Sequence, residues 1–98
     1  MYSVRITKRA DQDIDDLIDY IENNLSAPMT AEKFARGIYQ KIISLQTHAG
    51  IYPISIQESV QKYGSNVRRI NYKDFAIIYT VEDGKVIIHR IIHGSLII

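Results

Sequence analysis

The chain lacks cysteine altogether, and it has no tryptophan and only two prolines. Without cysteine it can form no disulfide, use no thiolate nucleophile and hold no cysteine-ligated zinc. It also lacks any apolar run of about 18 residues, the length that a membrane-spanning helix requires. Its opening residues, MYSVRITKRA, are too short and too polar a stretch for a signal peptide. These absences favour a cytoplasmic protein that does not enter a membrane.

Net charge is also small, because 12 lysines and arginines face 11 aspartates and glutamates, which gives +1. Composition therefore does not indicate a strongly basic nucleic-acid binder. The charges are nevertheless unevenly spread. Six acidic residues and no basic residue lie from Asp11 to Glu22, whereas six basic residues against three acidic ones follow Val60. An acidic helix and a mildly basic sheet are expected, serving either solubility or partner choice.

The first half of the chain shows a strand pattern followed by two helix patterns. Apolar residues alternate from Tyr2 to Thr7, which predicts a half-buried strand. Apolar spacings of three and four then predict two helices, with Thr7 as the N-cap of the first. A short break, NNLSAP, makes them antiparallel neighbours. The two apolar stripes are Ala10, Ile14, Leu17, Ile18, Ile21 and Leu25, then Ala31, Phe34, Ala35, Ile38, Ile42 and Leu45.

The last third, from Val67 to Gly94, predicts three antiparallel strands joined by two-residue turns at Lys73-Asp74 and Asp83-Gly84. Residues 51–66 carry no clear pattern. With a length of 98 residues, we expect one domain over residues 1–98. The expected fold class is α+β. An N-terminal strand is followed by an antiparallel helical hairpin packed on one face of an antiparallel sheet, in the order β-α-α-β-β-β.

The two turns also predict a strand register and, by alternation, two sheet faces. The predicted pairs are Ile70 with Ile77, Arg69 with Ile78, Tyr79 with Ile88 and Ile78 with His89. The more apolar face is assigned to the core beneath the helices. Its members are Arg68, Ile70, Tyr72, Phe75, Ile77, Tyr79, Val81, Val86, Ile88, Arg90 and Ile92. The second face holds Val67, Arg69, Asn71, Ala76, Ile78, Thr80, Ile87, His89, Ile91 and His93.

The second face has no predicted helix to cover it, yet it carries Ile78, Ile87 and Ile91. An uncovered apolar strip typically marks a binding surface. The residues predicted to bind a partner are Arg69, Asn71, Ile78, Ile87, His89, Ile91 and His93. On the first face we expect structural roles for Arg68 and Arg90, because long basic side chains bury their stems.

Three phrases span nearly the whole chain: YSVRITKRADQDIDDLIDYI, AEKFARGIYQKIISL and VRRINYKDFAIIYTVEDGKVIIHRIIHG. Together they resemble the RelE/ParE superfamily of toxins from bacterial type II toxin–antitoxin modules, and more closely its ParE branch. The resemblance implies the same fold, a helical hairpin on an antiparallel sheet. It also implies a plasmid-stabilisation toxin whose partner is a cognate antitoxin.

The superfamily that the chain resembles has members with two different activities. ParE-like members bind and inhibit DNA gyrase, whereas RelE-like members cut mRNA on the ribosome with basic residues. Aligned on IIYTVEDGK, the positions of those basic residues are Val67, Arg69, Ala76 and Leu96. Only Arg69 is basic here. RNA cleavage needs a base for the 2′-hydroxyl and cations for the phosphorane, so the ParE-like activity, which acts by binding, is favoured.

The histidines keep the alternative of a degenerate mRNA endoribonuclease open. His93 suits proton transfer near neutral pH, with His89 and Arg69 as assistants. The favoured interpretation is that His93 bonds the backbone at a strand end, because a lone histidine is weak evidence of catalysis. The spacing of His48, His89 and His93 does not indicate zinc, and no metal or other cofactor is expected. The sequence also leaves open whether the protein forms a homodimer.

Overall fold

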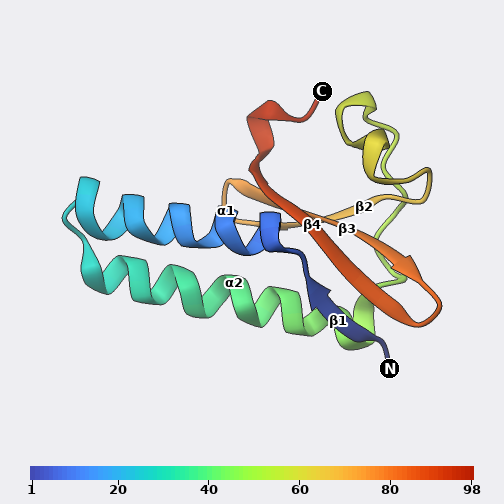
Figure 1. Cartoon of the computed structure of the whole chain (residues 1–98), viewed down its shortest axis with the longest axis horizontal. Coiled ribbons are helices and arrows are strands. Elements are labelled where there is room, and N and C mark those ends of the chain that lie inside the picture. Colours follow the sequence, from blue (N-terminus) through green and yellow to red (C-terminus); the bar gives the residue numbers. More distant parts are fainter.

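The strand, the two helices and the three further strands occur in the predicted order, which confirms the α+β fold class (Figure 1). The structure is a computed structural model that describes all 98 residues. Its elements are β1 (Ser3–Ile6), α1 (Lys8–Asp19), α2 (Pro28–His48), β2 (Arg68–Tyr72), β3 (Phe75–Glu82) and β4 (Lys85–His93). A π-helical turn covers Tyr20–Asn24, and two 3₁₀ helices cover Glu58–Tyr63 and Gly94–Leu96. None of the helices combines the length and the apolar character that crossing a membrane requires.

The four strands form one sheet in the order β1-β4-β3-β2. β2, β3 and β4 are antiparallel, as expected, whereas β1 joins β4 in parallel, so the sheet as a whole is mixed. The register of the first hairpin is confirmed, since Ile70 pairs with Ile77 and Arg69 pairs with Ile78. β2 is left as an edge strand.

A β-bulge interrupts the pairing of β3 with β4. Tyr79 pairs with Ile88, as predicted, but Ile78 pairs with Arg90. His89 is therefore an extra residue in β4, and the predicted pair of Ile78 with His89 is wrong. Arg90 consequently shares the sheet face of Ile78, not the face beneath the helices.

The bulge moves the last residues of β4 to the face opposite the predicted one. Ile91 pairs with Ile77 and joins the core beneath the helices, with 4% of its surface exposed. His93 pairs with Phe75 and lies on that same side. Ile92 instead packs against the cluster on the other face. The predicted faces of these three β4 residues are wrong because an extra residue reverses the alternation.

Residues at the helix starts, together with one glycine on α2, shape the helical hairpin of α1 and α2. The Thr7 hydroxyl oxygen accepts the Ala10 N–H at 3.1 Å, which confirms the predicted N-cap. Pro28 begins α2, where its missing N–H costs nothing. Gly37 allows α2 to pack closely against β2, because the Cβ of any other residue at this position would overlap the hydroxyl of Tyr72.

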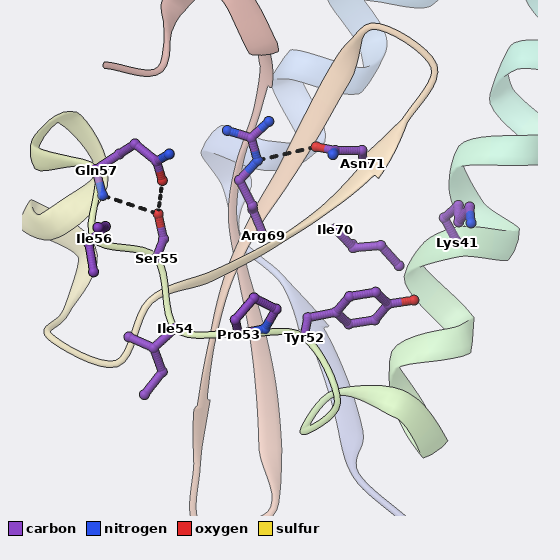
Figure 2. Close-up of a pocket in the computed structure, with 10 residues that line it drawn as sticks. All are labelled: Lys41, Tyr52, Pro53, Ile54, Ser55, Ile56, Gln57, Arg69, Ile70 and Asn71. Atoms are coloured by element: carbon purple, nitrogen blue, oxygen red, sulfur yellow. Dashed lines mark hydrogen bonds between the residues drawn. The ribbon is translucent and has the colours of Figure 1, made fainter.

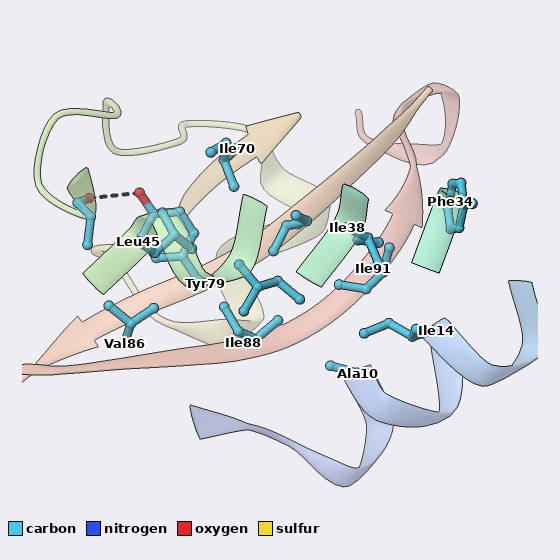
Figure 3. Packing of buried hydrophobic residues seen from close by; sticks show 13 residues of the cluster. Ala10, Ile14, Phe34, Ile38, Leu45, Ile70, Tyr79, Val86, Ile88 and Ile91 are labelled. Atoms are coloured by element: carbon cyan, nitrogen blue, oxygen red, sulfur yellow. Dashed lines mark hydrogen bonds between the residues drawn. The ribbon is translucent and has the colours of Figure 1, made fainter. Parts of the chain in front are cut away.

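Between the helices and the sheet lies a core cluster of 13 buried residues (Figure 3). At its centre the fully buried Tyr79 donates a hydrogen bond to the Ala49 carbonyl at 2.7 Å. Burial raises the pKa of Tyr79 to about 12, so the hydroxyl keeps its proton. Phe34 packs against Tyr72 and Phe75, with ring centroids 5.4 and 5.7 Å away. This face of the sheet is the one the sequence assigned to the core.

Residues 51–66 cover the opposite face of the sheet, with Val60 packed over the strands. Val60 is 1% exposed, and the strand-side residues beneath it, Val67, Ala76 and Ile78, are each 0% exposed. The expectation of an uncovered second face is therefore wrong. An irregular segment has no period that would reveal its buried side in the sequence.

Backbone and side-chain hydrogen bonds hold this covering segment at two points. The Ser55 N–H donates to the Val67 carbonyl at 2.7 Å. In the middle of the segment, the Ser59 N–H donates to the Ile98 carbonyl at 3.0 Å, and the Ile98 N–H donates to the Ser59 hydroxyl at 3.1 Å. The C-terminal residues therefore close the second face together with residues 51–66.

Candidate functional site

Arg69 and Asn71 lie together on the edge strand β2 (Figure 2). The Arg69 Nε donates to the Asn71 side-chain oxygen at 3.2 Å. The other end of the Arg69 guanidinium lies beside Gly94, whose N–H donates to the Asp74 carbonyl at 2.8 Å. The two predicted residues are thus brought together, between the β2 edge and the turn that follows β4.

These two residues form one side of a groove that the sequence did not predict (Figure 2). Its lining residues are Lys41, Tyr52, Pro53, Ile54, Ser55, Ile56, Gln57, Arg69, Ile70 and Asn71. Ile54 and Ile56 are 48% and 91% exposed, which is unusual for isoleucine. The only sequence signal for the groove was this pair of isoleucines in a segment without periodicity.

His89, the bulge residue, is held on the second face of the sheet. Its Nε2 lies 2.8 Å from the Thr80 hydroxyl, and its ring stacks on Tyr63 with centroids 5.3 Å apart. Burial lowers the pKa of His89, with Glu82 raising it to a smaller extent. The imidazole is therefore neutral near pH 7. Its Nε2 contacts the Thr80 hydroxyl, and its ring face packs on Tyr63.

His93 shapes the turn at the end of β4. Its Nδ1 accepts the Ser95 N–H at 3.1 Å and lies 2.7 Å from the Ser95 hydroxyl. Its ring meets Phe75 edge-on at 5.4 Å. His93 lies on the helix side of the sheet and His89 on the other side, so the set of Arg69, His89 and His93 is not assembled into one site.

The apolar strip predicted to bind a partner is not a continuous surface. Ile78 is 0% exposed under the covering segment, and Ile91 is 4% exposed within the core on the opposite face. Ile87 is half-buried on β4. The predicted strip is wrong as a surface, whereas the roles of the exposed members of the set stay predictions.

Two arginines outside this set have structural contacts, as expected. Arg90 donates through Nε and Nη2 to the Asp13 carboxylate at 2.7 and 3.2 Å, and the Ile91 N–H donates to the same carboxylate at 3.0 Å. The hydrogen bond with Asp13 raises the pKa of Arg90. Arg68 donates to the Tyr52 carbonyl. Asp13 therefore fixes α1 to β4 just beyond the bulge.

No three histidine, aspartate or glutamate side chains converge as a metal site. His48 lies at the end of α2, where its Nδ1 contacts the Thr47 hydroxyl at 2.7 Å. His48, His89 and His93 therefore lie in three separate environments.

The geometry defines an α+β protein with a helical hairpin on one sheet face, a covering segment on the other and one open edge groove. A family model described as "ParE toxin of type II toxin-antitoxin system, parDE" matches residues 4–97, and the chain belongs to this family. The resemblance seen in the sequence is thereby confirmed, and the chain is a type II toxin by family.

Among solved structures, the chain is similar to one described as "Chromosomal ParDE TA system from P. aeruginosa". The TM-score is 0.78 at 24% identity, over 95% of this chain and 96% of that one. At this identity the likeness supports the fold. No curated protein matches the chain.

Proposed function

We propose that this toxin acts in the cytoplasm by binding and inhibiting DNA gyrase, and that a cognate antitoxin neutralises it as part of a plasmid-stabilisation module. The family membership of residues 4–97 supports the toxin half of this proposal. The observation that favours binding over chemistry is the closed second face. Val67 and Ala76, two positions where the nuclease branch has basic residues, are apolar and 0% exposed.

The remaining polar residues support the same choice. Arg69 is the one cation at the nuclease positions, and its Nε is engaged by Asn71. His93 has its Nδ1 turned to the backbone of Ser95, and His89 is on the other side of the sheet. General acid–base cleavage needs a base and a cation converging on one phosphate, and the two histidines lie on opposite sides of the sheet and cannot share one such site.

We infer that the antitoxin contacts the exposed Asn71 and the half-buried Arg69, with the exposed His93 nearby. Both β2 residues face the groove in Figure 2. Antitoxin segments that fold on binding gain affinity from such preformed surfaces.

Expression in bacterial cells tests the proposal. We expect growth arrest with a DNA-damage response, restored growth when the antitoxin gene adjacent to the toxin gene is co-expressed, and unchanged toxicity in the variant His93→Ala. Circular dichroism of the purified variant controls for folding. Loss of toxicity in a folded His93→Ala variant, with mRNA decay in the wild type, would support the endoribonuclease alternative instead.

A further inference from the structure

The end of the helical hairpin lies away from the sheet. In Figure 1, α1 and α2 extend beyond the strands, and the π-helical turn Tyr20–Asn24 lies where the two helices are joined. Residues 19–30, the hairpin tip, include no buried residue, and only Ile21 and Ala27 among them are half-buried. The hairpin tip is therefore a projection that the rest of the chain leaves open to solvent.

Three large apolar side chains are exposed on the hairpin tip. Tyr20 is 51% exposed, Leu25 is 55% exposed and Met29 is 74% exposed. The fold holds the first two close together, because the Leu25 N–H donates to the Tyr20 carbonyl at 3.1 Å. Exposed apolar side chains that gather in one projecting segment are typical of a protein-binding surface.

The charges of the hairpin tip and of the helix turn before it are all negative. No lysine, arginine or histidine occurs between Arg9 and Lys33, whereas this stretch includes the exposed residues Asp16, Asp19 and Glu22. None of these three carboxylates forms an ion pair within the chain. A partner of the tip should therefore combine apolar surface with cationic side chains, because an acidic surface would be repelled.

Gyrase is the partner whose chemistry fits this description. An enzyme that acts on DNA needs lysine and arginine side chains on its surface, since these neutralise the phosphates. A second copy of the toxin fits poorly, because a two-fold contact between tips would place identical acidic surfaces against each other. The proposed antitoxin contact at Arg69 carries a cation, so it attracts a partner surface of the opposite charge.

We propose that the hairpin tip docks on a cationic surface of DNA gyrase, with its exposed apolar side chains in contact and its carboxylates facing lysines or arginines of the enzyme. This inference rests on the proposed function, since it takes gyrase as the target. It gives the toxin two separate contacts, one for the target at the end of the hairpin and one for the antitoxin on β2. The acidic charge of the first helix then serves partner choice.

The first test measures the affinity of the purified toxin for intact gyrase by surface plasmon resonance. A charge variant replaces the three carboxylates by amides: Asp16→Asn, Asp19→Asn and Glu22→Gln. A matched control neutralises three exposed carboxylates outside the tip: Glu58→Gln, Glu82→Gln and Asp83→Asn. We expect at least about tenfold weaker binding and a smaller salt dependence for the charge variant, and neither change for the control.

The second test removes apolar surface from the hairpin tip and keeps its charge. The double variant Tyr20→Ala and Met29→Ala changes only exposed side chains, so the fold should persist. Ile43→Ala is the matched control, because Ile43 is 57% exposed and lies about 20 Å further along α2 than Met29. We expect binding to gyrase to weaken by about tenfold or more for the double variant and to stay unchanged for Ile43→Ala.

Binding of the antitoxin encoded by the adjacent gene is measured for every variant and should be unchanged, which also shows that the variants are folded. Wild-type affinity for gyrase in both tip variants would overturn the tip as the docking site and leave gyrase as the target. Failure of the unmodified toxin to bind gyrase would instead overturn the proposed function. Normal gyrase affinity with lost antitoxin binding would assign the tip to the antitoxin. A toxin dimer in sedimentation that the tip variants abolish, again with normal gyrase affinity, would assign the tip to a second copy. Either of these last two results would overturn the proposal.

Discussion

The two faces of the sheet are both buried, but they are built in different ways. Beneath the helices, 13 buried residues form a core to which two long periodic elements contribute. On the other face, a cluster of 4 buried residues joins Val60 of the irregular segment to three residues on the sheet side, and Ile97 of the short C-terminal tail packs against it. β3 contributes residues to both clusters, because its adjacent residues Ile77 and Ile78 are each 0% exposed and point to opposite faces of the sheet. The second face is therefore closed by the chain itself, whereas the β2 edge of the sheet has no further strand beside it.

The variants Ile77→Ala and Ile78→Ala compare the two faces directly, because they delete the same atoms from adjacent residues. We expect Ile77→Ala to lower the free energy of unfolding by about 4 kcal/mol, since helices and sheet hold the cavity open. Ile78→Ala should cost about 2 kcal/mol, because the irregular cover can settle into the space. Urea denaturation followed by circular dichroism measures both. An equal or larger loss for Ile78→Ala would mean that the cover is as rigid as the helical layer.

Gly37→Ala tests how tightly α2 packs against β2. The added Cβ would overlap the Tyr72 hydroxyl, so overpacking should lower stability by about 2 kcal/mol despite the better helix propensity of alanine. In a Tyr72→Ala background the sign should reverse, and alanine should stabilise α2 by about 1 kcal/mol. A four-variant thermodynamic cycle checks this. If Gly37→Ala destabilised equally in both backgrounds, contact with Tyr72 would not be the cause.

The sequence was a good guide to whatever is periodic. The helical stripes, the Thr7 cap, both turns and the register of β2 against β3 follow from spacing and turn chemistry. The exception is Leu25, the last residue of the predicted first stripe, which lies beyond the π-helical turn and is 55% exposed. The bulge at His89 was not predictable, because an extra residue leaves no mark in an apolar strand such as KVIIHRIIH. That one residue turned Ile91 and His93 to the other face. The irregular cover was missed because a segment without a period does not reveal which of its residues are buried, and the expected open strip on the second face was therefore wrong.

Acid should weaken the second face more than the first, through His89. Burial lowers the pKa of His89 in the folded protein below the value of about 6.5 expected when unfolded, so the unfolded state binds more protons between these two pH values. Stability contributed by the neutral ring is therefore complete above about pH 6.5 and is lost as the pH falls through the folded-state pKa. Urea midpoints at a series of pH values should decline less steeply for His89→Asn. Identical slopes would show that His89 does not carry the effect.

The smallest loss of stability is expected when the hydrogen bonding between Ser59 and the C-terminal residue Ile98 is weakened. Ser59→Ala removes the hydroxyl that accepts the Ile98 N–H at 3.1 Å. Because this bond is exposed to solvent, global stability should fall by only about 0.5 kcal/mol. Hydrogen exchange at Ile98 should nevertheless become faster. Unchanged exchange would indicate that the backbone bond from the Ser59 N–H to the Ile98 carbonyl and the packing of Ile97 hold the tail without the hydroxyl.

Two assays on one toxin preparation decide the cellular target: supercoiling by purified gyrase, and cleavage of mRNA on purified ribosomes. We predict loss of supercoiling or trapped DNA breaks, at toxin concentrations comparable to that of gyrase, with intact mRNA. Cut mRNA with normal supercoiling would exclude gyrase as the target, and would make Arg69 and His93 the first residues to test for catalysis.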